Sequence, residues 1–469
     1  MTDDEVTSSG MIMDAARVAA ICAKIEEYAA GGAPMSGRRV AAICAMFDDR
    51  AAAGRTRRNK RRKKLCVDST RSYKQIGEIG SGSFGAVVKA RHRRTGQTVA
   101  IKTFRRRDGK KAPAVSELLR EACFLAACGG HPHLAGLHAV ARDPRTKRYS
   151  LVMEYVGPSL RRALKDHLRV HGGPFPEAEA RRVMAQLLAG AEAMHAHRIV
   201  HRDIKPGNVL VSEDGGGVVK ICDYGLAMST AKAGPPYARV GTSWYMAPEV
   251  LTRRTDYDER VDLWSLGCVM AEMLSGEVLF KVDDDDDDYI HQLDRMFDVL
   301  GAPGVDALQT FAPPFVEGKL LRRLARQPRS SHQGRLRELF PGETLSQDAF
   351  DVLKGLLTFN PKERLTAAAA LRLPWFTAAV DAPASEIGAM ASSTQTAAST
   401  FVRVRTSALA FLRRMALELI RLPRRCSGIM RRLLQSSNAL YEIEPPFEAG
   451  VVSSARVTAS KTEKDDSRY

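Results

Sequence analysis

Hydrophobic residues recur with two different periods along the middle of the chain. From residue 73, short apolar runs bounded by glycine or polar turns, among them "GAVVKARHRR", "TVAIKTF" and "YSLVMEY", have the alternation and the β-branched residues of strands. From about residue 176 onward, apolar residues recur every three to four positions, as in "EAEARRVMAQLLAGAEAMHAH" and "VDLWSLGCVMAEML", which predicts helices. A strand-rich part followed by a helix-rich part predicts an α+β fold with two lobes and a cleft between them.

Composition divides the 469 residues into three regions. We interpret residues 73–376 as the folded domain, 1–72 as an Ala-rich N-terminal extension, and 377–469 as a C-terminal tail that opens with Ala, Ser and Thr. The eight cysteines show no C-x-x-C spacing, which indicates a reducing compartment and argues against a zinc site. The acidic N-terminus is unlike a secretory signal, and no apolar run is long enough to predict a membrane-spanning helix.

The N-terminal extension repeats the stretch "RVAAICA" at residues 17–23 and 39–45, a period of 22. Each copy has Val, Ile and Cys at helical spacing, and "GGAPMSG" between the copies would end a helix. Two short amphipathic helices satisfy this pattern, and so does a duplication within a loosely ordered tail. The sequence leaves both interpretations open.

The net charge of +17 is spread over all three regions, so we expect no specific nucleic-acid partner. Residues 55–64, "RTRRNKRRKK", fit a nuclear-import signal, a phosphate-contacting arm or a solvated linker, and we expect a nuclear or cytoplasmic location. Residues 401–432 fit a basic amphipathic helix that docks on an acidic membrane surface or a partner groove, or packs back on the folded domain. The aspartate run 283–288 fits a solvated loop better than a metal site.

A glycine-rich turn follows the first strand of the folded domain. "IGSGSFGAV", residues 79–87, contains Gly80, Gly82 and Gly85 in a G-x-G-x-x-G pattern. The pattern alone is weak, but it lies between two strand-like runs instead of opening a helix, which disfavours a dinucleotide-binding site. Glycines at such a turn let backbone N–H groups approach phosphate oxygens, because no Cβ stands in the way.

A lysine and a glutamate follow at spacings that suit phosphate binding. Lys102 of "VAIK" lies on the strand after the glycine-rich turn, and a buried lysine there needs a carboxylate. "SELLREACFL", residues 116–125, supplies Glu121 on a helix. We expect Lys102 to hold the α- and β-phosphates of a nucleotide while Glu121 fixes the orientation of the lysine.

The segment "HRDIKPGNVL", residues 201–210, carries the strongest chemical signal. Asp203 is suited to accept the proton of a substrate hydroxyl, and Lys205 to steady a transferring phosphoryl group. Asn208 and Asp223, fifteen residues apart, are suited to bind metal ions. "GTSWYMAPE" and "DLWSLG" follow at compatible spacings, and chance does not explain the whole set.

These motifs resemble the eukaryotic protein kinase superfamily over residues 73–376, and "KPGN" resembles its Ser/Thr-specific form. The resemblance implies a small β-rich N-lobe and a larger helical C-lobe that transfer the γ-phosphoryl group of ATP, with Mg²⁺, to Ser or Thr hydroxyls of protein substrates. It implies catalytic roles for Asp203, Lys205, Lys102 and Glu121, and metal binding by Asn208 and Asp223. The residues that it places around the nucleotide are Ile79, Gly80, Ser81, Gly82, Ser83, Phe84, Gly85, Ala86, Val87, Ala100, Lys102, Glu154, Val156 and Leu210.

Within the superfamily the chain looks most like the cyclin-dependent-kinase group, and it resembles divergent plant members of the F type. The helix that carries Glu121 stands where those kinases contact a cyclin, so a cyclin-like activator is an expected partner on this helix. Residues 289–303 resemble the first part of the C-lobe insert of the group. By resemblance, Thr242 should contact Asp203, and Glu249 should pair with Arg364.

Two departures from the pattern of the group concern activation. Tyr237 stands where the group has its activating threonine. Met228 replaces an arginine that helps to bind the resulting phosphate, which leaves Arg120 and Arg202. We therefore expect basal activity without phosphate on Tyr237.

Tyr224 replaces the phenylalanine of the usual Asp-Phe-Gly triplet, while Asp223 is retained. The ring can take the place of the phenylalanine, whereas a buried hydroxyl needs a hydrogen-bond partner. The alternative to an active kinase is a pseudokinase scaffold that binds nucleotide and presents its tails to partners. Retention of Asp203, Asn208 and Asp223 favours the active enzyme.

Overall fold

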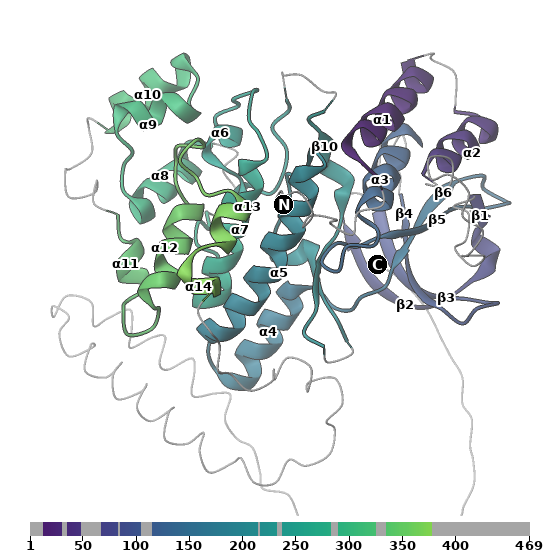
Figure 1. The fold of residues 1–469 in the computed structure, drawn as a ribbon, viewed down its shortest axis with the longest axis horizontal. Helices are drawn as coiled ribbons and strands as arrows, with labels where there is room; N and C mark the ends of the chain where they lie inside the picture. The colour runs from purple at the N-terminus through teal and green to yellow at the C-terminus, as the bar shows by residue number, and fades with distance from the viewer. Residues whose placement is uncertain are drawn as a thin grey trace, which may run out of the picture. The chain divides into compact units, whose positions relative to one another are not determined.

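Figure 1 shows the computed structural model of the protein. The residues that it describes are 13–30, 35–47, 67–82, 85–104, 115–213, 216–231, 237–282, 289–324 and 334–377. The predictions for the charge runs 55–64, 283–288 and 401–432 fall outside the described residues. Ser83 and Phe84 of the glycine-rich turn also fall outside them.

The N-lobe is built on a sheet that has six strands in the described part of the chain, in the order β1-β5-β6-β4-β3-β2. Strands β2 to β6 pair antiparallel, and β1 joins the edge parallel to β5. Helix α3 (Val115–Cys128) packs against β5 and β6. The strand bounds are β1 Val67–Ser69, β2 Tyr73–Gly82, β3 Gly85–His92, β4 Thr98–Thr103, β5 Leu137–Arg142 and β6 Tyr149–Glu154.

Local sequence explains the sharp turn between β5 and β6. The carboxylate of Asp143 accepts hydrogen bonds from the backbone N–H groups of Arg145 (2.8 Å) and Thr146 (2.7 Å), which is how an aspartate fixes a turn. These bonds hold the pKa of Asp143 below its ordinary value. The turn therefore joins β5 and β6 in the register that puts Arg142 opposite Tyr149.

The N-terminal repeat forms two helices, α1 (Ala15–Ala30) and α2 (Gly37–Met46). Each copy of the repeat buries its Val, Ile and Cys, and the side chain of Ser36 caps α2 by accepting from the N–H of Arg39. Helix α1 packs against α3, and α2 contacts β1 (Figure 1). Of the two interpretations that the repeat left open, the structure has the two amphipathic helices.

The C-lobe is helical, and the α+β, two-lobed fold predicted from the sequence is confirmed. Short strand pairs β7–β10 and β8–β9 carry the segments that face the N-lobe. Their bounds are β7 Ile199–Val200, β8 Val209–Val211, β9 Val219–Ile221 and β10 Met228–Ser229. The helices are α4 Leu160–His171, α5 Glu177–Ala196, α6 Pro248–Leu251, α7 Arg260–Ser275, α8 Tyr289–Leu300, α9 Val305–Phe311, α10 Pro314–Leu324, α11 Leu336–Leu339, α12 Gln347–Leu356, α13 Ala367–Leu371 and α14 Pro374–Thr377.

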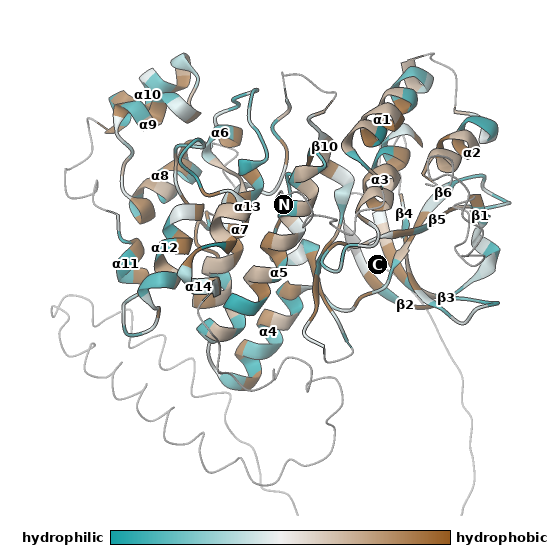
Figure 2. Cartoon of the chain, viewed as in Figure 1, coloured by the Kyte–Doolittle hydropathy of each residue, from teal (hydrophilic) through white to brown (hydrophobic). Residues whose placement is uncertain are grey.

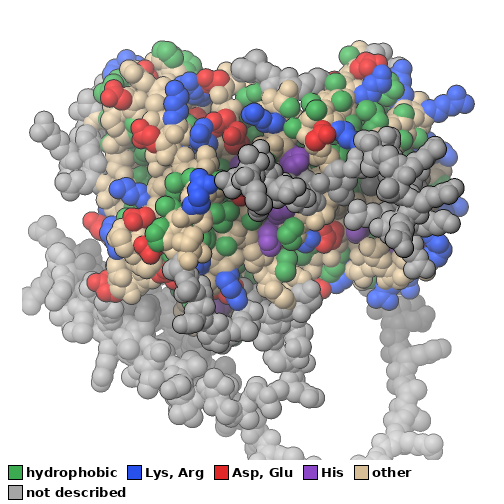
Figure 3. Space-filling model, in the orientation of Figure 1, with side chains coloured by type: hydrophobic (Ala, Val, Ile, Leu, Met, Phe, Trp, Pro, Cys, Tyr) green, Lys and Arg blue, Asp and Glu red, His purple; other side chains and the backbone are tan. Residues whose placement is uncertain are grey.

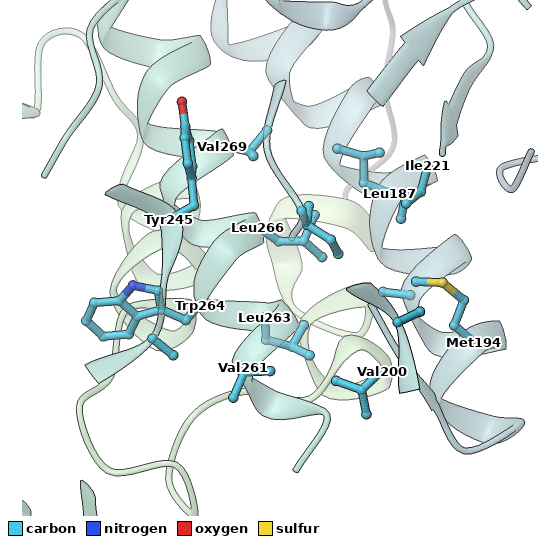
Figure 4. Close-up of a cluster of buried hydrophobic side chains, with 14 of the residues drawn as sticks. Leu187, Met194, Val200, Ile221, Tyr245, Val261, Leu263, Trp264, Leu266 and Val269 are labelled. Carbon is cyan, nitrogen blue, oxygen red and sulfur yellow. The ribbon is translucent and has the colours of Figure 1, made fainter. Parts of the chain in front are cut away.

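Helices α5 and α7 form the centre of the C-lobe core. Every residue of α7 from Val261 to Met273 is buried, as expected for a helix that is hydrophobic on all sides (Figure 2). Figure 4 shows side chains of α5 and α7 meeting Val200 of β7 and Ile221 of β9. The rings of Trp264 and Phe280 stack with centroids 5.6 Å apart. This core lies directly under the segments that carry the candidate site.

Surface charge on the face of Figure 3 is mixed. Lys and Arg side chains are spread over both lobes and alternate with Asp and Glu side chains. Across the described stretches of the chain, no helix combines the length and the apolar character that crossing a bilayer requires.

Candidate active site

Three charged side chains from separate elements meet between the lobes. Lys102 on β4 contacts both carboxylate oxygens of Glu121 on α3, with Nζ–O distances of 2.8 and 3.0 Å. The same Nζ lies 2.7 Å from Oδ1 of Asp223, which follows β9 in the C-lobe. The side chains of Lys102 and Glu121 are 6% and 2% exposed, so these charges interact with little screening by water. The structure thus brings together the lysine and glutamate that the sequence paired.

Burial and charge act in opposite directions on this cluster. Burial disfavours the ammonium of Lys102, but the two carboxylates outweigh it and hold the pKa of Lys102 above its ordinary value. Burial favours the protonated acid of Asp223, yet the Lys102 ammonium holds the pKa of Asp223 below its usual range. The lysine is therefore a permanent cation at neutral pH, and Asp223 a permanent anion.

A second polar cluster forms around Asp203. Lys205 Nζ lies 2.8 Å from Oδ2 of Asp203, and Thr242 Oγ1 donates to Oδ1 at 2.7 Å. Lys205 also donates to Thr242 Oγ1 at 2.7 Å, which closes a three-membered network. Both carboxylate oxygens of Asp203 are therefore oriented before any substrate arrives. The contact between Thr242 and Asp203 that the resemblance implied is present.

Asn208 completes this cluster and, with Asp223, offers oxygen ligands. Its side-chain N–H group donates to the backbone oxygen of Asp203 (2.9 Å) and to Oδ2 (3.0 Å), which leaves the amide oxygen as an acceptor. The side chain of Asp223 is 34% exposed. An amide oxygen and a carboxylate are hard donors of the kind that Mg²⁺ prefers, so these two residues fit a magnesium ion.

A buried carboxylate holds the catalytic loop (residues 201–208) in shape. Asp262 of α7 accepts from the backbone N–H groups of His201 and Arg202, both at 2.8 Å, and lies 2.9 Å from Nε2 of His195. Burial alone would raise the pKa of Asp262, but these donors hold the pKa below its ordinary value. The sequence marked Asp262 within a motif but not its role, because its partners lie 60 residues away in the chain.

The residues expected around the nucleotide come from strands of both lobes. Strand register puts Gly80 opposite Val87, and Ala100 opposite Met153. The carboxylate of Glu154 pairs with Lys220 Nζ at 2.9 Å, so any contact of Glu154 with a nucleotide falls to its backbone. The described members are Ile79, Gly80, Ser81 and Gly82 on β2, Gly85, Ala86 and Val87 on β3, Ala100 and Lys102 on β4, Glu154 at the end of β6, Val156 after it, and Leu210 on β8.

Gly85 is required where β3 begins. Its φ is +146°, and a Cβ added there would overlap the backbone oxygen of Thr103. The absence of a side chain lets β3 approach β4 closely enough for Val87 to pair opposite Lys102. The glycine-rich turn is thus shaped by the strand pairing that also positions the lysine.

The ring of Tyr224 is buried beside the catalytic loop. Tyr224 is 1% exposed, its ring centroid lies 5.4 Å from that of His201, and it shares a core cluster with Leu125 and Leu137. Its hydroxyl donates to the backbone oxygen of Ile221 at 3.5 Å, and the thiol of Cys128 on α3 is a neighbouring group. Burial raises the pKa of Tyr224, so the hydroxyl keeps its proton. The partner that the buried hydroxyl needs is therefore the backbone oxygen of Ile221, with Cys128 beside it, and sequence spacing revealed neither.

The segment from Asp223 to Glu249, called here the activation segment, is held by Tyr257, a residue that the sequence analysis did not single out. Arg202 donates to the hydroxyl of Tyr257 at 3.0 Å, and that hydroxyl donates to the backbone oxygen of Ala238 at 2.7 Å. The ring of Tyr237 lies 5.3 Å from the ring of Tyr257. Arg202 also donates to the backbone oxygen of Leu226 at 2.7 Å. One of the two arginines expected to bind a phosphate is thus engaged with neutral groups.

Two further contacts fix the end of this segment. Glu249 and Arg364 form a buried two-point ion pair with N–O distances of 2.6 and 2.9 Å, as the resemblance implied. Gly241 has φ +118°, and an added Cβ would lie 2.5 Å from the backbone oxygen of Arg202. The activation segment therefore passes close against the catalytic loop at a position that only glycine fits.

A family model described as "Protein kinase domain" matches residues 73–376, and the chain belongs to this family. The chain is 48% identical over 318 residues to "Putative cyclin-dependent kinase F-2" of Oryza sativa subsp. japonica, an alignment that covers 66% of this chain and 91% of the relative. It is 37% identical over 324 residues to "Cell division control protein 2 homolog 3" of Trypanosoma brucei brucei, covering 67% and 94%. The chain is a protein Ser/Thr kinase of the cyclin-dependent-kinase group, as the motifs predicted.

Proposed function

We propose that the chain transfers the γ-phosphoryl group of ATP, with Mg²⁺, to Ser or Thr hydroxyls of protein substrates. The observation that carries this proposal is the joint geometry of two clusters, Lys102 with Glu121 and Asp223, and Asp203 with Lys205 and Thr242. Each cluster draws its members from segments far apart in the chain. Phosphoryl transfer depends mainly on such positioning and on charge stabilisation, so an intact pair of clusters supports activity.

In this proposal Asp203 accepts the proton of the target hydroxyl. The target oxygen forms its bond to the γ-phosphorus as the bond from that phosphorus to the β–γ bridging oxygen breaks, and the electron pair leaves with ADP. Lys205 stabilises negative charge on the group in transfer, while Lys102 orients the α- and β-phosphates. Asn208 and Asp223 would hold a magnesium ion, which would neutralise charge on the phosphates.

The remaining sequence expectations stay proposals. Protein substrates and the cyclin expected on α3 follow from the names of the relatives and from the resemblance. Helix α1 of this chain packs against that same helix, which bears on the need for a cyclin. A nuclear or cytoplasmic location rests on residues 55–64 alone, a run of eight basic residues in ten.

The test is an assay of the purified full-length chain with radiolabelled ATP against peptide libraries that offer only Ser and Thr or only Tyr as acceptors. We expect transfer to the Ser and Thr library, with loss of activity on chelation of Mg²⁺. Asp203→Asn should reduce the rate by at least ~10³-fold while ATP binding is retained, because the carboxylate acts on the acceptor and not on the nucleotide. Wild-type activity no greater than that of Asp203→Asn, with ATP still bound, would establish the pseudokinase alternative.

A further inference from the structure

Helix α3 is covered on the side that faces away from the active site. Glu121 points at Lys102, and residues two positions away on a helix point about 200° from it. Leu119 and Cys123 are those residues, and both are fully buried. In a kinase of this group, the corresponding side is where the sequence led us to expect a cyclin. Some part of the chain itself already covers it.

The N-terminal helix α1 provides this cover. Its buried side chains are Val18, Ile21, Cys22 and Ile25, the spacing of a single apolar stripe along a helix. Helix α1 packs against α3 (Figure 1), and the buried side chains of the stripe belong to the same core cluster as Leu119 and Cys123 of α3. The neighbouring thiol of Cys22, together with burial, raises the pKa of Cys123. The exposed fraction of Val18, Ile21 and Ile25 is 0%. The contact therefore has the burial of a core and not of a loose surface association.

The second helix of the extension fastens the first to the N-lobe. The guanidinium of Arg17 on α1 donates to the backbone oxygen of Met46 at the end of α2, at 3.2 and 3.0 Å. Helix α2 repeats the stripe with Val40, Ile43 and Cys44 and contacts β1, whose residues pair with β5 of the sheet. The two helices, called here the α1–α2 hairpin, thus connect α3 to the sheet at a second place.

The ion pair between Lys102 and Glu121 is formed in the same structure in which the hairpin covers α3. Outward movement of α3 would separate Glu121 from Lys102 and would also expose the apolar stripe of α1 to water. The hydrophobic contact therefore opposes the movement that would break the site. An inhibitory clamp would instead hold α3 with the ion pair broken.

We propose that the α1–α2 hairpin is a built-in activating element that holds α3, and through it Glu121, where a cyclin would otherwise be needed. The inference rests on the proposed kinase function, since it describes how the same site is kept assembled. Val18, Ile21 and Ile25 are positioning residues: they touch neither nucleotide nor target. A cyclin directed to the outer side of α3 finds that side occupied.

Adjacent residues of α1 provide a matched pair of variants for the test. Ile21→Asp puts a carboxylate into the buried stripe, whereas Ala20→Asp puts the same carboxylate on the exposed side of the same helix. In the full-length chain without any partner, we expect Ile21→Asp to lower kcat at least ~10-fold and Ala20→Asp to stay within twofold of wild type. Backbone amide exchange of α3 should become faster in Ile21→Asp only.

A double-mutant cycle separates positioning from general loss of structure. If the hairpin acts through Glu121, then Ile21→Asp should add little to the loss caused by Glu121→Gln, because both break the same ion pair. Independent effects that multiply would contradict the inference. If Ile21→Asp does not fold, Ile25→Ala is a milder change in the same stripe that can replace it. We expect Ile25→Ala to lower kcat about threefold, and to add little to the loss caused by Glu121→Gln.

Other outcomes also decide the matter. Unchanged or higher activity in Ile21→Asp, or wild-type activity that appears only after a cyclin is added, would overturn the inference while the proposed function stands. If wild type is no more active than Asp203→Asn, the proposed function fails. Amide exchange then still reports on the hairpin: faster exchange of α3 in Ile21→Asp sustains the positioning role, and unchanged exchange refutes it.

Discussion

The catalytic loop and the activation segment lie against each other but are held by different kinds of contact. The catalytic loop is held by a buried, charged acceptor, because the carboxylate of Asp262 accepts hydrogen bonds from the backbone N–H groups of His201 and Arg202. Around Tyr237 the activation segment is held by neutral groups, the hydroxyl of Tyr257 and the rings of Tyr257 and Tyr237, whereas its end is fixed by the ion pair of Glu249 with Arg364. We therefore expect the rate of phosphoryl transfer to fall more when the charged contact of the catalytic loop is removed than when a neutral contact of the activation segment is removed.

Removal of the charged acceptor should have the largest effect. Asp262→Ala leaves the buried N–H group of His201 without its acceptor, at about 1–3 kcal/mol, removes the acceptor of the part-buried N–H group of Arg202, and frees the loop that carries Asp203. We expect a clear drop in Tm and a loss of activity of at least ~10²-fold, measured by thermal unfolding and initial rate. Asp256→Ala, which removes a half-exposed carboxylate paired with Arg254, is the control and should leave both unchanged. Equal behaviour of the two variants would contradict the anchoring role.

A substitution where the activation segment passes close to the catalytic loop should lower the activity nearly as much. Gly241→Ala introduces a Cβ 2.5 Å from the backbone oxygen of Arg202, in a backbone conformation with φ +118°. We expect the activation segment to shift and kcat to fall about tenfold or more, with folding retained. Gly173→Ala, where no atom lies within 4 Å of the added Cβ, should be neutral. A fully active Gly241→Ala would show that the two regions do not need this contact.

Loss of the hydrogen bonds made by the Tyr257 hydroxyl should lower the activity by an intermediate amount. Tyr257→Phe keeps the ring beside Tyr237 but removes the hydroxyl that joins Arg202 to Ala238. Loss of these two hydrogen bonds corresponds to roughly 1–2 kcal/mol if both were fully formed, and we expect a three- to tenfold lower rate at unchanged KM for ATP. A loss of rate in Tyr257→Phe as large as that in Asp262→Ala would show that the neutral contacts of the activation segment matter as much as the charged contact of the catalytic loop.

The smallest effect is expected at the position of the usual activating threonine. Tyr237→Phe retains the ring that packs 5.3 Å from Tyr257, and Arg202 is already engaged by neutral partners. We expect a rate within about threefold of wild type, with or without phosphatase treatment. Mass spectrometry of the phosphatase-treated protein, which should still be active, should find no phosphate on Tyr237. A tenfold loss in Tyr237→Phe would mean that this hydroxyl, or its phosphate, orders the segment.

The parts of the site that the sequence predicted are those that local motifs encode. Asp203, Lys205 and Asn208 lie within six residues of one another, and the motifs "VAIK" and "SELLREACFL" sufficed to pair Lys102 on a strand with Glu121 on a helix. The contacts of Tyr257 with Arg202 and of Asp262 with Arg202 cross 55 and 60 residues of chain, where spacing carries no information. Likewise, the period of α1 predicted an apolar face, but a hydrophobic stripe does not name the surface that will cover it.

We expect this kinase to assemble its site by its own contacts, without a cyclin and without phosphate on the activation segment. The most direct measurement is the initial rate of phosphoryl transfer by the full-length chain, treated with phosphatase and assayed alone, beside Asp203→Asn prepared in the same way. We expect a wild-type rate at least ~10³-fold above that of the variant. Equal rates for the two, with wild-type activity appearing only after a cyclin or an activating kinase is added, would contradict it.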